Sequence, residues 1–134
     1  MKKICCVALV CVLTLGLACG AMAESFSSPS LDPGKGWSPS WTAKKTSGVG
    51  VSSSVTATAS SSRAIFQATT RKTDGVPASE TERFTGSCSG LKLATKYDGN
   101  QKALLRTGYT YVLRIAHRSN SPISSASASG TWEP

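Results

Sequence analysis

The chain has 134 residues, of which 40% are hydrophobic, and its formal net charge is +8, from 15 lysines and arginines against 7 acidic residues. This length suits one domain with a single small core. The positive balance favours anionic partners over basic ones.

The first 23 residues predict export. Met1–Lys3 is a short positive start, residues 4–18 are apolar apart from Thr14 and Gly16, and Ala21-Met22-Ala23 has the small-x-small form that signal peptidase accepts. Cleavage after Ala23 is the leading prediction. It removes two lysines and leaves 13 basic against 7 acidic residues.

Two other fates of this leader stay open. Leu17-Ala18-Cys19-Gly20 resembles the lipobox of bacterial lipoproteins, although Gly16 stands where such a box usually has leucine, so Cys19 is a candidate for lipidation. Alternatively, residues 4–23 remain as an uncleaved anchor that the two lysines orient with the body outside. All three readings predict a secreted or cell-surface location for residues 24–134.

The next segment, residues 24–48, is rich in proline, glycine and serine and is expected to be a partly ordered lead-in. Its two tryptophans suggest that part of it packs on the following domain. A first strand is compatible with residues 37–45. The domain itself is predicted to span residues 49–134.

Within this domain, short runs of alternating polar and apolar residues predict strands. Asp74-Gly75 and Asn120-Ser121-Pro122 supply turns between them. The expected strands cover residues 50–60, 63–70, 81–88, 91–97, 109–117 and 125–132. No window repeats apolar residues at helical spacing for three turns. We therefore predict an all-β fold, a small antiparallel β-sandwich, immunoglobulin-like or similar, of six to seven strands.

The segment Gly108–Arg114, followed by a polar turn and a final strand, resembles the C-terminal half of small exported proteins of Gram-positive bacteria, most of which are uncharacterised β-sandwiches. The resemblance covers about the last 30 residues. It implies the fold and the compartment, and it transfers no catalytic or binding residue.

Charged side chains on two of the expected strands suggest a binding surface. Lys92 and Lys96 lie opposite the apolar face of one strand, and Arg114 and Arg118 lie opposite the apolar face of another. If both strands belong to one sheet, the four cations share its outer surface, which Lys102 and Arg106 extend. The competing interpretation is an ordinary solubilising surface.

The leading functional hypothesis is therefore a non-enzymatic, secreted or envelope-associated module that binds an anionic cell-wall polymer or a membrane surface through these four residues. Nucleic acid is disfavoured, because no run of exposed aromatics is interleaved with the cations. A secreted bacteriocin or toxin is the alternative, since small size, positive charge and a β fold permit it.

A third hypothesis is a glycan-binding module. Trp37, Trp41 and Trp132 can stack on sugar rings if they are exposed. Packing in the core is the favoured role for these side chains, because tryptophan buries a large area. Tyr109 and Tyr111 are predicted to share a buried face with Leu113 and Ile115 and so to lie in the core.

Catalysis is not expected. If the leader is removed, Cys88 is the one remaining cysteine, so no internal disulfide can form and stability must come from packing. A half-buried structural role for Cys88 is favoured over a reactive thiol served by His117 or a link between two copies.

No histidine or cysteine cluster suggests a metal or other cofactor, and Asp98-Gly99-Asn100 is interpreted as a turn.

Overall fold

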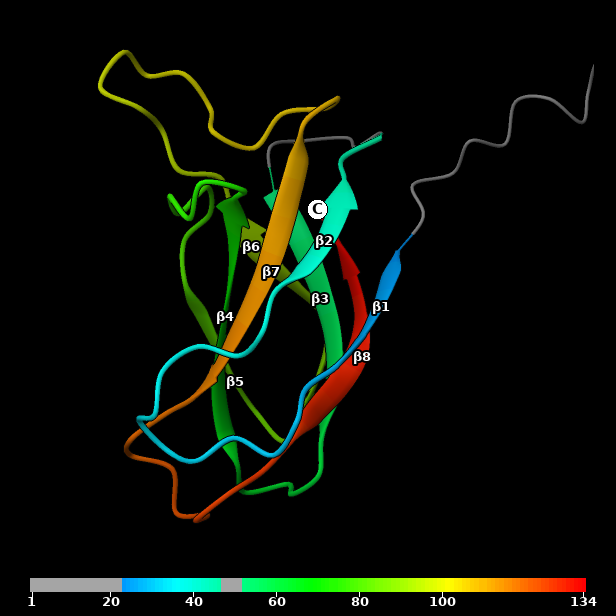
Figure 1. Cartoon of the computed structure of the whole chain (residues 1–134), viewed down its shortest axis with the longest axis vertical. Helices are drawn as coiled ribbons and strands as arrows, with labels where there is room; N and C mark the ends of the chain where they lie inside the picture. Colours follow the sequence, from blue (N-terminus) through cyan, green and yellow to red (C-terminus); the bar gives the residue numbers. More distant parts are fainter. Residues whose placement is uncertain (1–22, 47–51) are drawn as a thin grey trace, which may run out of the picture.

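A computed structural model describes residues 23–46 and 52–134. Cys19 and the rest of the predicted leader up to Met22 lie outside this part, as do residues 50–51 at the start of one expected strand. Strands are the regular elements here: β1 (Glu24–Ser27), β2 (Trp41–Lys44), β3 (Ser52–Ala59), β4 (Ile65–Lys72), β5 (Glu82–Thr85), β6 (Ser87–Ala94), β7 (Thr110–His117) and β8 (Ala128–Glu133) (Figure 1).

The strands form two antiparallel sheets of four, in the orders β1-β8-β3-β6 and β2-β7-β4-β5. The predicted β-sandwich is therefore confirmed, with eight strands in the described residues rather than six or seven. The first strand pairs with the last, and the pairing continues inward as β2–β7, β3–β6 and β4–β5. This nested order is the connectivity of a jelly roll rather than that of an immunoglobulin domain.

The core lies between the two sheets and follows the strand alternation. Alternate residues point inward and are buried, among them Val55 and Ala57 of β3 and Tyr111, Leu113 and Ile115 of β7. Phe66 of β4 stacks on Phe84 of β5 and on the His117 ring, with ring centroids 5.6 and 5.0 Å apart. The largest fully buried apolar side chains are Trp132, Tyr111, Phe66, Leu93, Leu105, Leu113, Ile115 and Val55.

A buried polar contact also joins the sheets. The hydroxyl groups of Ser53 and Thr70 lie 2.6 Å apart, and the indole N–H of Trp132 donates to the Thr70 hydroxyl at 3.2 Å. Thr70 belongs to one sheet and its two partners to the other. Each buried polar group of this trio therefore has a partner, as a dry interior requires.

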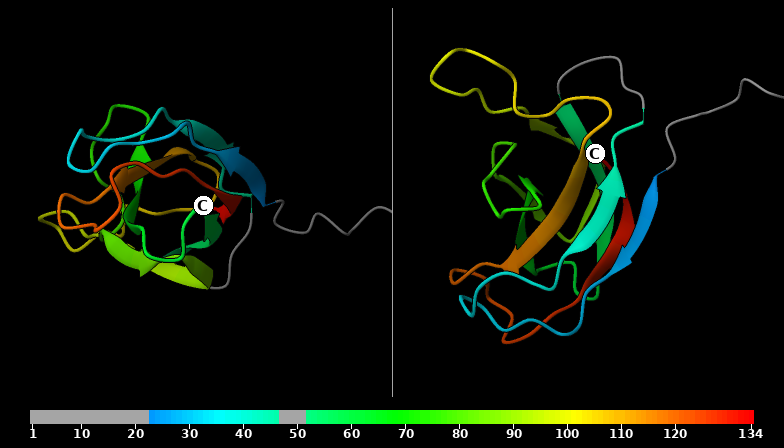
Figure 2. Two further views of the ribbon diagram at one scale, coloured as in Figure 1. Left: turned by 90° about the horizontal axis from the view of Figure 1, so that it is seen from below. Right: turned by 45° about the horizontal axis from the view of Figure 1, so that its top comes forward.

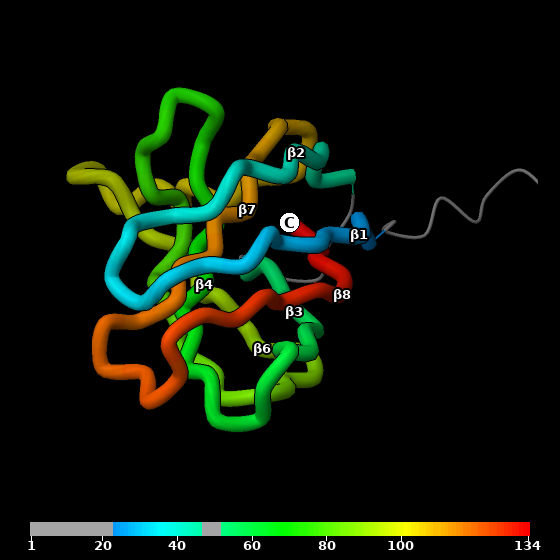
Figure 3. Tube along the Cα trace, turned by 60° about the horizontal axis from the view of Figure 1, so that its bottom comes forward, coloured from blue at the N-terminus to red at the C-terminus, as the bar shows by residue number. Residues whose placement is uncertain are grey.

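The expected lead-in contributes two strands to the sandwich, both within its described residues 24–46. Phe26 of β1 is buried in the core, and its ring packs against that of Trp41 in β2 at 5.4 Å between centroids. The chain between these strands runs to the lower end of the view in Figure 1 and returns, so that β1 and β2 enter different sheets (Figures 2 and 3).

The expected strand over residues 81–88 is divided in the structure. Gly86 follows β5 and precedes β6, and these strands lie in different sheets. Its φ is +64°, and a Cβ atom there would lie 2.9 Å from the carbonyl oxygen of Ser62. Glycine allows the chain to cross between the sheets at this position.

Tyr109 differs from its prediction. It was expected in the core, but its side chain is 59% exposed, whereas Tyr111 is buried as predicted. Strand β7 begins at Thr110, and Gly108 just before it has a φ of +91°. Tyr109 therefore belongs to the bend that leads into the strand, where the alternation of the strand does not apply.

Candidate functional site

The four cations predicted to form one basic surface lie on two different sheets. Lys92 is on β6, which pairs with β3, whereas Arg114 is on β7, which pairs with β2 and β4. Lys96 follows β6 and Arg118 follows β7. The condition for a shared surface, that both strands belong to one sheet, is not met, because the chain changes sheet at Gly86 between β5 and β6.

The sheet that carries Lys92 has a nearly neutral outer surface. The register places Lys92 opposite Ser54, whose other neighbour is Glu133. Lys96 lies 3.7 Å from Glu80 in an exposed ion pair. The remaining outward positions of this sheet are mostly small hydroxyl residues: Ser25, Ser27, Ser52, Ser54, Thr56, Thr58, Ser87, Ser129 and Thr131.

The other sheet has a basic outer surface, which we call the arginine face. Its register puts Arg114 opposite Thr69, Arg71 opposite Val112, and Arg83 opposite Gln67. The arginine face comprises Lys44, Arg71, Arg83, Arg114 and Arg118. The other outward positions of its four strands are neutral: Thr42, Ile65, Gln67, Thr69, Thr85, Thr110, Val112 and Ala116.

Local contacts hold several of these side chains in place. The Arg114 guanidinium donates to the carbonyl oxygen of Ser38 at 2.5 Å. The Arg118 guanidinium donates to the side-chain oxygen of Gln67 at 3.0 Å. Such fixed guanidinium groups lose little conformational entropy when they bind an anion.

Trp37 adds an aromatic ring to the arginine face. It forms a β-bridge with Ala116, and the Arg71 guanidinium carbon lies 4.8 Å from its ring centroid. A hollow of about 210 Å³ lies beside this ring, and Gln67, His117 and Arg118 are among its lining residues. Arg71, Arg83 and Lys44 were missed at the sequence level because their common face depends on which strands pair.

The other two tryptophans pack in or against the core, as predicted. Trp132 is fully buried, and Trp41 is partly buried and packs against the core. The three rings therefore do not form one exposed platform for sugars. Trp37 is partly buried and lies among arginines instead.

His117 and Cys88, considered together as a reactive pair, lie in different sheets. The imidazole of His117 is buried, and its two nitrogens lie 2.8 Å from the carbonyl oxygen of Leu31 and 2.7 Å from the Ser121 hydroxyl. Burial raises the pKa of the Cys88 thiol above its ordinary value, while a backbone hydrogen bond from Ala57 opposes this shift. These surroundings do not activate the thiol.

Within residues 23–46 and 52–134, no three histidine, cysteine or acidic side chains gather as metal ligands would. The same part of the chain contains no helix that is long and apolar enough to cross a membrane. Comparisons with protein-family models, with curated proteins and with solved structures find no match to this chain.

Proposed function

We propose that this chain is an exported, non-catalytic binding protein whose arginine face holds an anionic polymer of the cell envelope. The observation that carries the proposal is the outer surface of the β2-β7-β4-β5 sheet, where five cations stand at outward positions without an acidic residue among them. The predicted leader supports the envelope as the place of action.

The type of cation supports a polymer with phosphate or carboxylate groups. Four of the five cations are arginines, and a guanidinium can donate two parallel hydrogen bonds to one such group. The four strands spread these cations across the sheet, so that a chain of repeating anions could contact several of them at once. Lys92 and Lys96 are left outside the proposed site.

Binding to isolated bacterial cell walls and to immobilised polyphosphate tests this proposal. The form beginning at Glu24, which retains all eight strands, is compared with the triple variant Arg83→Gln, Arg114→Gln, Arg118→Gln over a salt series. We expect retention of the unmodified form to weaken with rising salt, and the variant to lose about tenfold or more in affinity.

The matched control removes the same charge elsewhere, through Lys92→Gln, Lys96→Gln and Lys102→Gln. We expect this control to retain most of the binding, because its substitutions leave the arginine face intact. Equal losses in the two triple variants would show that total charge governs binding and would refute the assignment of the site. If neither the cell walls nor the immobilised polyphosphate retains the unmodified form at low salt, the proposed function is refuted.

A further inference from the structure

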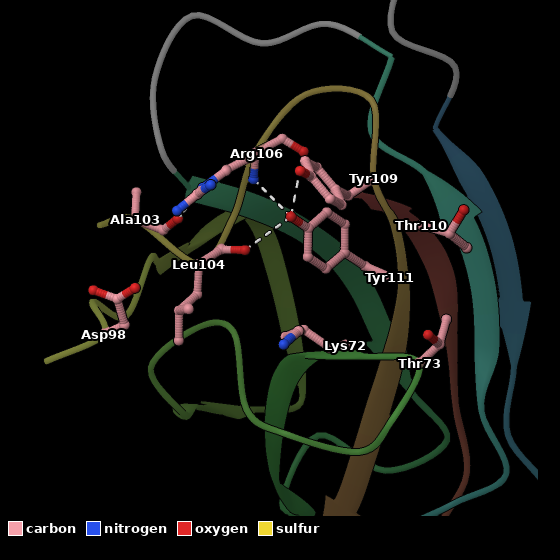
Figure 4. A pocket seen from close by; sticks show the side chains of 9 residues that line it. All are labelled: Lys72, Thr73, Asp98, Ala103, Leu104, Arg106, Tyr109, Thr110 and Tyr111. Atoms are coloured by element: carbon pink, nitrogen blue, oxygen red, sulfur yellow. Dashed lines mark hydrogen bonds between the residues drawn. The ribbon is translucent and has the colours of Figure 1, made fainter. Parts of the chain in front are cut away.

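A second concave site lies at one end of the sandwich, next to the arginine face. It is a cleft of about 370 Å³ formed by the β4–β5 turn, the β6–β7 loop and the start of β7, a size typical of sites for small molecules. Figure 4 shows the side chains that line it: Lys72, Thr73, Asp98, Ala103, Leu104, Arg106, Tyr109, Thr110 and Tyr111.

One wall of this cleft is held rigidly by Tyr111. Its hydroxyl donates to the carbonyl oxygen of Leu104 at 2.8 Å and accepts from the backbone N–H of Arg106 at 2.7 Å (Figure 4). The phenol of a core residue therefore ties the β6–β7 loop to β7. A loop fixed in this way presents a preformed cleft.

The charges in and beside the cleft cancel by count, with Lys72 and Arg106 against Asp74 and Asp98. Lys72 forms an ion pair with Asp74 at 3.4 Å, and the Arg106 Nε donates to the carbonyl oxygen of Ala103 at 2.6 Å. Asp98 adds a negative charge to the lining. The cleft therefore differs from the arginine face, and its charges do not favour a strongly anionic ligand.

The remaining groups suit a ligand with hydroxyl groups and an apolar face. Tyr109, which is 59% exposed, lines the cleft, and Thr73 and Thr110 are among its other lining residues. One carboxylate oxygen of Asp98 accepts the backbone N–H groups of Asn100 and Lys102 at 2.8 and 2.9 Å, which fixes the carboxylate. A fixed carboxylate can accept hydrogen bonds from hydroxyl groups.

We propose that this cleft binds a neutral pyranose sugar, with the C–H face of the sugar against the Tyr109 ring and its hydroxyl groups donating to Asp98. A pyranose combines an apolar face with a rim of hydroxyls, which matches the exposed ring and the fixed carboxylate. This site is separate from the arginine face, and it does not depend on the tryptophans.

Two-dimensional NMR of the 15N-labelled form beginning at Glu24 tests the proposal, with maltotriose and chitotriose as neutral probes at about 10 mM, enough to fill a site of millimolar affinity. We expect at least one probe to shift the amide signals of Asp98 and Thr110 in a saturable manner. If neither probe shifts them, the proposal is refuted.

Substitutions of two similarly exposed tyrosines test whether the sugar binds in the cleft. Tyr109→Ala is expected to weaken binding about tenfold, in line with the loss of one aromatic contact. Tyr97→Ala removes a ring that is 55% exposed but does not line the cleft, and it should leave affinity unchanged. Equal effects of these two substitutions would refute the site.

Asp98→Asn keeps an oxygen that can accept the turn hydrogen bonds but removes the charge. This substitution should therefore also lower the affinity of the cleft for the sugar. Glucuronic acid and inorganic phosphate serve as anionic probes. If either perturbs the Asp98 and Thr110 signals at lower concentration than both neutral sugars do, the cleft prefers an anion and the assignment to a neutral sugar is wrong.

Discussion

Lys45 is buried where the two sheets meet at one end of the sandwich. Its ammonium group donates to the main-chain oxygens of Pro134 at 2.6 Å and of Ser52 at 3.3 Å. Burial lowers its pKa below the ordinary value of 10.5, against an opposing effect of the Glu133 carboxylate. The polar contacts of Lys45 therefore offset only part of its desolvation.

This lowered pKa predicts how stability changes with pH. Between the pKa of the folded state and 10.5, the unfolded chain binds more protons at Lys45 than the folded protein does. The contribution of this residue to the free energy of unfolding should therefore increase as pH rises through that window. The gain is absent at lower pH, where Lys45 is protonated in both states.

Urea unfolding of the wild type and of Lys45→Met from neutral pH to 10.5 measures this contribution. Groups such as Cys88, whose raised pKa acts in the opposite direction at alkaline pH, remain in both proteins and cancel in the difference. We expect the stability of the wild type to rise relative to the variant as pH increases. A pH-independent difference would contradict the role given to Lys45.

At the scale of elements, alternation was sufficient to locate the core strands. The predicted range 109–117 matches β7, and 63–70 overlaps β4, which begins two residues later because Ala64 still belongs to a turn. β1 was missed because Ser-Phe-Ser offers one apolar residue and no pattern. The sequence predicted a single strand across β5 and the start of β6, because an alternating pattern does not show that the backbone changes direction at Gly86.

Gly130 on β8 permits a close approach to β3. A Cβ atom at this position would lie 2.0 Å from the carbonyl oxygen of Thr56, a contact that requires the backbones to separate. We predict that Gly130→Ala destabilises the protein by about 3 kcal/mol or more, at the upper end of overpacking effects.

Thermal or urea unfolding checks this prediction, with Ser129→Ala as the control. Ser129 is the exposed neighbour on the same strand, so its substitution should change stability by less than about 0.5 kcal/mol. If Gly130→Ala unfolds at the same denaturant concentration as this control, the close packing of β8 on β3 is not required.

At the scale of the whole molecule, the two outer surfaces have different chemistry. One sheet presents serine and threonine, and the other presents the arginine face. The sequence pattern correctly placed Arg114 and Arg118 on an outer surface, but their neighbours come from strands that are distant in the chain. Pairing such as β1 with β8 is non-local, so residue spacing alone could not show that Arg71 and Arg83 join them.

The most direct test of the central claim is to observe the arginine side chains while an anionic polymer binds. Titration of the 15N-labelled protein with polyphosphate, followed through the Nε–Hε signals, reports each guanidinium separately. We predict that the signals of Arg71, Arg83, Arg114 and Arg118 shift together while the amide signal of Lys92 stays unchanged. Shifts confined to the surface around Lys92, or equal shifts over both sheets, would contradict the assignment of binding to the arginine face.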